Sequence, residues 1–253
     1  MPFCMAHRGF SGIAPENTMI AFEKVLELDN VHSIELDVQL SREGIPVIIH
    51  DFSLERTTNG FGLVRDKTYH ELRELDAGSW FSEQYAGEKI PSLEEVLELL
   101  RNKECLVNIE LKTAGGLYKG YEHTIIDLVK KYGMENKVCL TSFDHKVIKN
   151  IKDIETEIRT GLIIEGNPVL LREQLLDCGA SILSINVHFL TFELVERLKK
   201  DQFDIFTWTV NDAATMEEVI GISEDIYICT NFPDRYMETV TKMNKLAGNP
   251  INL

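Results

Sequence analysis

From residue 92 onward the chain alternates short apolar runs with longer amphipathic stretches, and this regularity restricts the fold more than any other feature of the sequence. The apolar runs indicate strands, and the periodic spacing of apolar residues in the longer stretches indicates helices. Repeated strand–helix units predict a parallel sheet. The runs cover 104–111, 137–141, 158–164, 182–187, 203–210 and 225–229, and the helix-like stretches cover 92–101, 119–132, 144–152, 168–177, 191–200, 212–221 and 233–246.

Two further apolar runs precede this region and complete the strand count of a barrel. Residues 2–7 and 33–38 read as strands, with a helix-like stretch over about 17–29 between them. About eight parallel strands in roughly 230 residues are typical of a (β/α)8 TIM barrel. An open doubly wound sheet is the alternative, but residues 7–12 lack the glycine-rich dinucleotide fingerprint that would favour it. We therefore expect an α/β fold with a closed barrel.

One strand-like segment, residues 45–49, does not fit the alternation. It begins only about eight residues after Asp37, which is too short a connection for a parallel crossover. We therefore expect an antiparallel hairpin with the second barrel strand, with its turn near Arg42 and Glu43. In that register His50 falls opposite Glu35, beside the carboxylates of the second strand.

The following residues, 51–91, depart from the barrel pattern altogether. They are rich in turn-forming residues and contain one short helix that begins at Thr68. We interpret them as a small insertion after the second barrel strand, of the kind that often forms a wall of a barrel active site. No linker or repeat is evident, so we expect a single domain over residues 1–253 with an insertion at about 51–91.

Charge and composition exclude several classes of partner. The 253 residues carry a formal net charge of −15, with a pI near 4.9, which argues against nucleic acid and anionic membranes as partners. No apolar run approaches the roughly 20 residues of a membrane span, and residues 1–8 lack a secretory leader. The five cysteines read as buried apolar residues rather than a disulfide framework. We expect a cytoplasmic protein with a small-molecule substrate, no nucleic acid, no stable membrane association and an oligomeric state left open.

Three carboxylates lie at the ends of apolar runs, where a charge is costly unless it is paired or binds a metal. Glu35 and Asp37 are two residues apart on the second strand and so project from the same face. Glu110 ends the next barrel strand. Three hard oxygen ligands at a barrel mouth suit Mg²⁺ or Ca²⁺ better than zinc.

Histidines and cations accompany these acids. His7 and His50 are candidates for general acid and base, because imidazole titrates near neutrality. Arg8 offers a bidentate fork for phosphate oxygens, and Lys112 follows the last of the carboxylates by two residues. Two cations, a metal site and two imidazoles suggest chemistry on a phosphate ester. Trp208, at the end of a later strand, is a candidate wall for a small organic group.

In their order along the chain, these segments resemble the glycerophosphodiester phosphodiesterase family. No single motif is decisive, but the ordered set is specific and spans residues 6 to about 233. The motifs are His7-Arg8-Gly9, Pro15-Glu16-Asn17-Thr18, Ile34-Glu35-Leu36-Asp37-Val38, His50-Asp51, Glu55-Arg56-Thr57-Thr58-Asn59-Gly60, Leu75-Asp76-Ala77-Gly78-Ser79-Trp80-Phe81, Ile90-Pro91-Ser92-Leu93-Glu94-Glu95-Val96, Asn108-Ile109-Glu110-Leu111-Lys112 and Trp208-Thr209-Val210-Asn211.

The resemblance implies a barrel with a small inserted subdomain that hydrolyses glycerophosphodiesters to sn-glycerol 3-phosphate and an alcohol. It also implies a divalent metal ion, Mg²⁺ or Ca²⁺, as cofactor. By position, His7 and His50 take the acid–base roles, Glu35, Asp37 and Glu110 bind the metal, Arg8 and Lys112 bind phosphate, and Trp208 lines the glycerol side of the pocket. The identity of the alcohol, and which histidine is the acid, stay open. The nucleophile, water or the substrate's own 2-hydroxyl, also stays open.

Two positions depart from the family pattern. The chain has Thr230-Asn231 where the family often has Thr-Asp, and Ser41-Arg42-Glu43-Gly44 where it often has Thr-x-Asp-Gly. We expect neither to touch the metal or the histidines, so both bear on substrate preference rather than on activity.

Two other functions compete with this hypothesis. A non-catalytic binding protein on the same barrel would be expected to lack a histidine or a metal carboxylate, and none is lacking. A phospholipase-type lipid phosphodiesterase acting on intact membranes would need an exposed apolar or basic segment. The insertion holds Trp80, Phe81 and Tyr85 but no basic cluster, so this function is the second choice.

Overall fold

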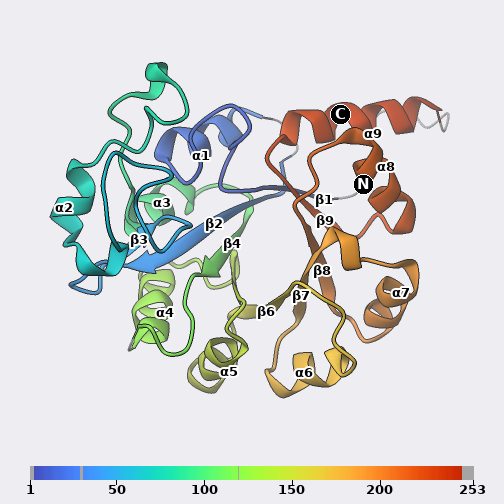
Figure 1. Ribbon diagram of the computed structural model, residues 1–253. Helices are drawn as coiled ribbons and strands as arrows, with labels where there is room; N and C mark the ends of the chain where they lie inside the picture. Colours follow the sequence, from blue (N-terminus) through green and yellow to red (C-terminus); the bar gives the residue numbers. More distant parts are fainter. Residues whose placement is uncertain (1–2, 29–30, 119, 247–253) are drawn as a thin grey trace.

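The computed structural model describes residues 3–28, 31–118 and 120–246, and within them eight parallel strands close into a barrel (Figure 1). Hydrogen bonding runs from β1 through β9, β8, β7, β6, β5 and β4 to β2, and pairing of β1 with β2 completes the circle. The predicted (β/α)8 fold is confirmed. The barrel strands are β1 (Phe3–Ala6), β2 (Ser33–Leu40), β4 (Leu106–Leu111), β5 (Val138–Ser142), β6 (Arg159–Ile164), β7 (Ile182–Asn186), β8 (Asp204–Trp208) and β9 (Tyr227–Thr230).

Helices surround the barrel and bury their apolar faces against it. Local sequence fixes several of their starts: the Thr18, Thr191 and Asp212 side chains each accept a hydrogen bond from a backbone N–H in the first turn. The first helix is shorter than the predicted 17–29, of which residue 29 lies outside the described residues. The helices are α1 (Met19–Leu26), α3 (Leu93–Leu100), α4 (Tyr121–Lys131), α5 (His145–Ile154), α6 (Leu171–Asp177), α7 (Phe192–Lys200), α8 (Ala213–Ile222) and α9 (Pro233–Leu246), with a 3-10 turn η3 (Val187–Phe189) before α7.

Two apolar layers hold the barrel together. The larger lies between the strands and the helices, where residues such as Leu36 and Phe22 are fully buried. The smaller fills the barrel interior with Met5, Cys139, Ile182, Phe206 and Cys229. A packed interior leaves the mouth, at the carboxyl ends of the strands, as the place for a binding site.

The hairpin after β2 forms as predicted, but its register differs by one residue. β3 (Pro46–Ile48) pairs antiparallel with β2, with Val38 opposite Ile48, and continuing this register places residue 50 opposite Leu36 rather than Glu35. The predicted pairing of His50 with Glu35 is therefore wrong. The turn includes Gly44 at a φ of 84°, a left-handed conformation that suits glycine, and its centre lies further along the chain than the sequence pattern suggested.

Residues 51–91 form a layer beside β3 (left side of Figure 1). They contain η1 (Val64–Asp66), α2 (Tyr69–Glu74) and η2 (Glu83–Tyr85), and α2 begins at a capping box between Thr68 and Glu71. A small apolar cluster, separate from the barrel core, consists of Val47, Ile49, Leu54, Val64, Leu72, Ala77 and Ile90. This packing fixes the hairpin, and with it the backbone that carries His50.

Candidate active site

The three predicted carboxylates meet at the barrel mouth. Parallel pairing of β2 with β4 places Asp37 beside Glu110, and Glu35 projects from the same face of β2 as Asp37. One oxygen from each side chain lies within 4.8 Å of the others. The three side chains therefore lie together, as their positions at strand ends predicted.

This carboxylate set has the electrostatics of a cation site. Glu35 and Asp37 are almost completely buried, and among the described residues Glu35 Oε1 and Asp37 Oδ1 have no hydrogen-bond partner. Burial, together with the Asp37 charge, raises the pKa of Glu35 and of Glu110. Burial would also raise the pKa of Asp37, but Arg8, His50, Lys112 and the Asn17 hydrogen bond together outweigh burial and hold that pKa low. Buried carboxylate oxygens without donors fit a divalent cation as their missing partner.

Arg8 is held in place by an unusual backbone conformation. It adopts a left-handed φ of 56° and is followed by Gly9 at 77°, where a Cβ would come within 2.8 Å of the backbone of Ala21. This bend lets the Arg8 backbone N–H donate to Glu35 Oε2 at 2.9 Å while its Nε lies 3.1 Å from Asp37 Oδ2. The His-Arg-Gly sequence therefore positions a guanidinium directly beside the acids.

Lys112 supplies the second cation. Its Nζ donates to Glu110 Oε1 at 2.8 Å, lies 3.1 Å from His50 Nε2, and lies 3.9 Å from Asp37 Oδ1. Burial would lower the pKa of this amine, but the two carboxylates outweigh it and raise the pKa, so Lys112 is charged at neutral pH. Lys112 therefore links the carboxylate set to one of the two candidate acid–base groups.

His7 also lies in the site, but its partner was not anticipated. Its Nδ1 lies 2.6 Å from Asn231 Oδ1, and its Nε2 lies 4.0 Å from Glu35 Oε2. Burial, and then the charge of Arg8, lowers the pKa of His7 to about 4, so the ring is neutral at pH 7. The expectation that the Asn231 departure does not touch a histidine is wrong, because the first and last barrel strands are neighbours.

His50 has an anionic partner instead. Its Nδ1 lies 2.6 Å from Asp51 Oδ1, and Asp51 in turn accepts from Arg56. Arg56 also donates to both oxygens of Glu16. Hydrogen bonds from Arg56 hold the pKa of Asp51 low, so the carboxylate stays ionised beside the ring. Burial still lowers the pKa of His50 below its usual range.

A cavity of about 360 Å³ opens above these groups and is lined by both histidines, Arg8, Glu35, Glu110 and Lys112. Trp208 and Phe143 form its apolar wall, with ring centroids 5.8 Å apart in an edge-to-face arrangement. Within the described residues, Trp208 Nε1 has no hydrogen-bond partner. A larger and more open hollow of about 1300 Å³ lies between the loops after β4 and β5, but none of the candidate catalytic groups lines it.

Four residues of the site were missed or undervalued from the sequence. Asn17 donates to Asp37 Oδ2 at 2.8 Å from a left-handed backbone, and Asp51 and Asn231 orient the two histidines. Cys229 was read as a buried apolar residue, yet it lines the cavity. For Asp51 the adjacent His50 was a usable signal. Asn231 and Cys229 come close to His7 only because the barrel closes between β1 and β9, so the predicted barrel was the available signal for both.

A barrel mouth with two fixed cations, two imidazoles and an oxygen-rich cation site is that of an enzyme acting on a phosphate ester. Comparison with known sequences makes this specific: a sequence model of the "Glycerophosphoryl diester phosphodiesterase family" matches residues 7–235. The chain belongs to this family, and its predicted class, a phosphodiesterase acting on glycerophosphodiesters, is confirmed.

Individual relatives agree over almost the whole length. A "Glycerophosphodiester phosphodiesterase" of Caldanaerobacter subterraneus is 40% identical over 94% of this chain and 97% of its own. One of Bacillus altitudinis is 37% identical over 94% and 98%. An Oleispira antarctica phosphodiesterase, solved in complex with the product sn-glycerol-3-phosphate, is 30% identical, with a TM-score of 0.89 over 95% of this chain and 97% of that one. The described part of the chain holds no helix long and apolar enough to cross a membrane.

Proposed function

We propose that this chain cleaves glycerophosphodiesters in a divalent-metal-dependent reaction to sn-glycerol 3-phosphate and an alcohol, using His7 and His50 for proton transfer. The observation that carries the proposal is a single cavity lined by both histidines, two cations and the carboxylate set. We further propose that residues 1–253 act as one domain whose insertion, about 51–91, supports the hairpin carrying His50.

Glu35, Asp37 and Glu110 are the proposed metal ligands. Their oxygens lie within 4.8 Å of one another, and two of them lack a donor among the residues described. A bound Mg²⁺ or Ca²⁺ would neutralise charge on the phosphate oxygens. All three ligands are hard oxygen atoms, as either ion prefers.

Arg8 and Lys112 are the proposed phosphate-binding side chains. Both line the cavity, and Arg8 is anchored through Glu35, Asp37 and Glu16. A guanidinium and an ammonium fixed before the substrate arrives can stabilise the extra negative charge of the transition state without reorganising. Trp208 is proposed to pack against the glycerol carbons and to offer its free N–H to a glycerol hydroxyl.

The partners of the two histidines support a division of labour. Asn231 is neutral, and its Oδ1 accepts the Nδ1 proton of His7, which leaves Nε2 with a free lone pair toward Glu35. Asp51 is anionic and stabilises a protonated His50, which offsets part of the lowering of the His50 pKa by burial and by the charges of Arg8 and Lys112. We therefore propose that His7 takes the proton of the nucleophile and that His50 protonates the leaving alcohol.

An activated leaving group tests this division. An alcohol of low pKa, such as p-nitrophenol, leaves without a general acid. His50→Ala should therefore regain most of its lost kcat on glycerol-3-phospho-p-nitrophenol relative to glycerophosphocholine, whereas His7→Ala should lose the same factor, relative to the unmodified enzyme, on both substrates. Recovery by His7→Ala instead would reverse the two roles. A substrate analogue without the 2-hydroxyl distinguishes the nucleophiles, because only direct attack by water leaves its rate unaffected.

The proposed function as a whole is tested on a panel of glycerophosphodiesters with and without chelator. We expect release of sn-glycerol 3-phosphate from one or more members, its loss on chelation, and its return on addition of Mg²⁺ or Ca²⁺. Full activity after exhaustive chelation would show that the reaction does not require a metal.

A second candidate function, hydrolysis of acylated substrates at a lipid surface, is favoured by one observation. The segments between β5, β6 and β7 and the helices that follow them lie at the catalytic end of the barrel. They and the first turn of α7 expose the apolar side chains Phe143, Val169, Leu170, Phe189 and Phe192. We expect a rate on lysophospholipid that rises sharply above its critical micelle concentration if this function holds. A rate that follows only the dissolved substrate would exclude it.

A further inference from the structure

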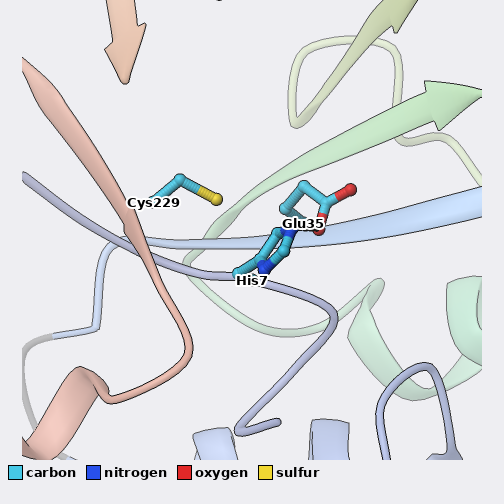
Figure 2. A group of neighbouring side chains, drawn as sticks. All are labelled: His7, Glu35 and Cys229. Atoms are coloured by element: carbon cyan, nitrogen blue, oxygen red, sulfur yellow. Dashed lines mark ion pairs between the residues drawn. The ribbon is translucent and has the colours of Figure 1, made fainter. Parts of the chain in front are cut away.

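Cys229 lies beside the candidate general base, at a position the phosphodiesterase reaction does not use. The ligand atoms of His7, Glu35 and Cys229 lie within 4.8 Å of one another. Figure 2 shows the Cys229 side chain on β9 pointing its sulfur toward Glu35, with the His7 ring next to the carboxylate. One nitrogen, one oxygen and one sulfur atom therefore converge from three neighbouring strands, β1, β2 and β9.

Each of the three groups is available as a ligand. His7 Nδ1 is taken up by Asn231 at 2.6 Å, which orients the ring and leaves Nε2 free toward the cluster. Glu35 is 4% exposed and its Oε1 has no partner among the described residues. The Cys229 side chain is buried as well, yet it borders the cavity, so an ion can reach it from the mouth.

We propose that His7, Glu35 and Cys229 form a binding site for Zn²⁺, distinct from the all-oxygen set of Glu35, Asp37 and Glu110. Zinc prefers nitrogen and thiolate ligands with tetrahedral geometry, whereas Mg²⁺ and Ca²⁺ do not bind thiolates well. Tetrahedral ligands lie about 3.3–3.6 Å apart at ordinary zinc distances, so small side-chain rotations close the cluster. On binding, the Cys229 thiol gives its proton to solvent, and water or a phosphate oxygen fills the fourth position.

Occupation of this site inhibits the enzyme. Coordination engages the Nε2 lone pair with which His7 would accept a proton, and it engages Glu35, which is shared with the oxygen site. The inhibition rests on the proposed function, whereas binding rests on the arrangement of the three ligands alone. Zinc and the hard cation therefore compete through Glu35, and zinc inhibition weakens as Mg²⁺ or Ca²⁺ is raised.

Binding is tested without reference to activity, with Cd²⁺ as an optical substitute for Zn²⁺. We expect the metal-free protein to develop the near-ultraviolet absorption of a cadmium–thiolate bond, and Zn²⁺ to displace it. Cys229→Ser and Cys229→Ala should abolish this absorption. Cys105→Ser is the matched control, because Cys105 is the only one of the five cysteines that is not buried, and it should retain the band.

Inhibition is measured as the zinc concentration that halves each variant's own rate at fixed Mg²⁺. Loss of a thiolate ligand should raise that concentration at least about tenfold in both Cys229 variants, and leave it unchanged in Cys105→Ser. A cadmium band that survives in both Cys229 variants would overturn the site. If the Cys229 variants lose the cadmium band but keep the same zinc sensitivity, metal binding at Cys229 stands and the proposed inhibition through that site is overturned. Circular dichroism confirms that each variant is folded.

Discussion

The replacement Asn231→Asp tests how the partner of His7 sets its protonation. In this chain His7 Nδ1 lies 2.6 Å from a neutral amide oxygen, and burial followed by the Arg8 charge lowers the pKa of His7 to about 4. An aspartate of nearly the same shape puts a negative charge at that oxygen. Because a negative charge stabilises the imidazolium, the pKa of His7 should rise.

The size of the rise follows from the contact distance. A charge about 4 Å from the centre of the imidazolium, at an effective dielectric constant of about 20, contributes about 4 kcal/mol, which corresponds to about 3 in pKa. Burial of the new carboxylate offsets part of this energy. We therefore expect the pKa of His7 to rise by about 1–3, from about 4 toward the range in which the enzyme is assayed.

The assay is the pH dependence of kcat/KM, compared between the two proteins at the same saturating metal concentration. A general base must be unprotonated and a general acid protonated, so kcat/KM follows a bell-shaped pH dependence, and a raised pKa of His7 moves its acidic limb to higher pH. With a rise of 3, activity at pH 6 falls about tenfold. Asn231→Ala, which removes the hydrogen bond without adding charge, should not move the limb upward. An acidic limb of Asn231→Asp that stays in place or moves to lower pH would refute the reasoning.

Three further outcomes follow from the site. Glu110→Gln should keep the fold but lose binding of Mg²⁺ or Ca²⁺, as measured by calorimetry, and full activity would remove Glu110 from the ligand set. Trp208→Ala should raise KM several-fold through lost apolar contact, whereas a lower melting temperature with unchanged kinetics would make its role structural. His7→Ala and His50→Ala should each reduce kcat on natural substrates about 10²–10⁴-fold, and a loss below tenfold for either would exclude it from proton transfer.

Much of the fold and of the carboxylate set at the candidate metal site could be predicted, because both depend on local pattern. Alternating apolar runs gave the barrel strands to within a few residues, and costly charges at strand ends identified Glu35, Asp37 and Glu110. The register of the hairpin could not be obtained in this way. It depends on the conformation of one turn, in which Gly44 is left-handed, and a one-residue change alters which residue faces His50.

Contacts between residues on different barrel strands are the other feature that a local sequence pattern does not predict. Pairing of β1 with β9 sets Met5 opposite Cys229 and Ala6 opposite Thr230, so the residues that follow, His7 and Asn231, become neighbours although 224 positions separate them. A predicted barrel implies that its first and last strands are adjacent, but not in which register.

That register decides the chemical environment of each histidine. It adds an amide and a thiol to the surroundings of His7, neither of which carries a negative charge, whereas Asp51, the residue next to His50 in the chain, gives His50 a carboxylate held ionised by Arg56. The same closure that places the neutral Asn231 beside His7 therefore also places Cys229 beside it, at the proposed zinc site. In both cases the decisive residue lies on the last strand or directly after it, and replacing Asn231 or Cys229 separates the two effects. The Asn231 replacement alters the protonation of His7, and the Cys229 replacement alters the binding of zinc beside it.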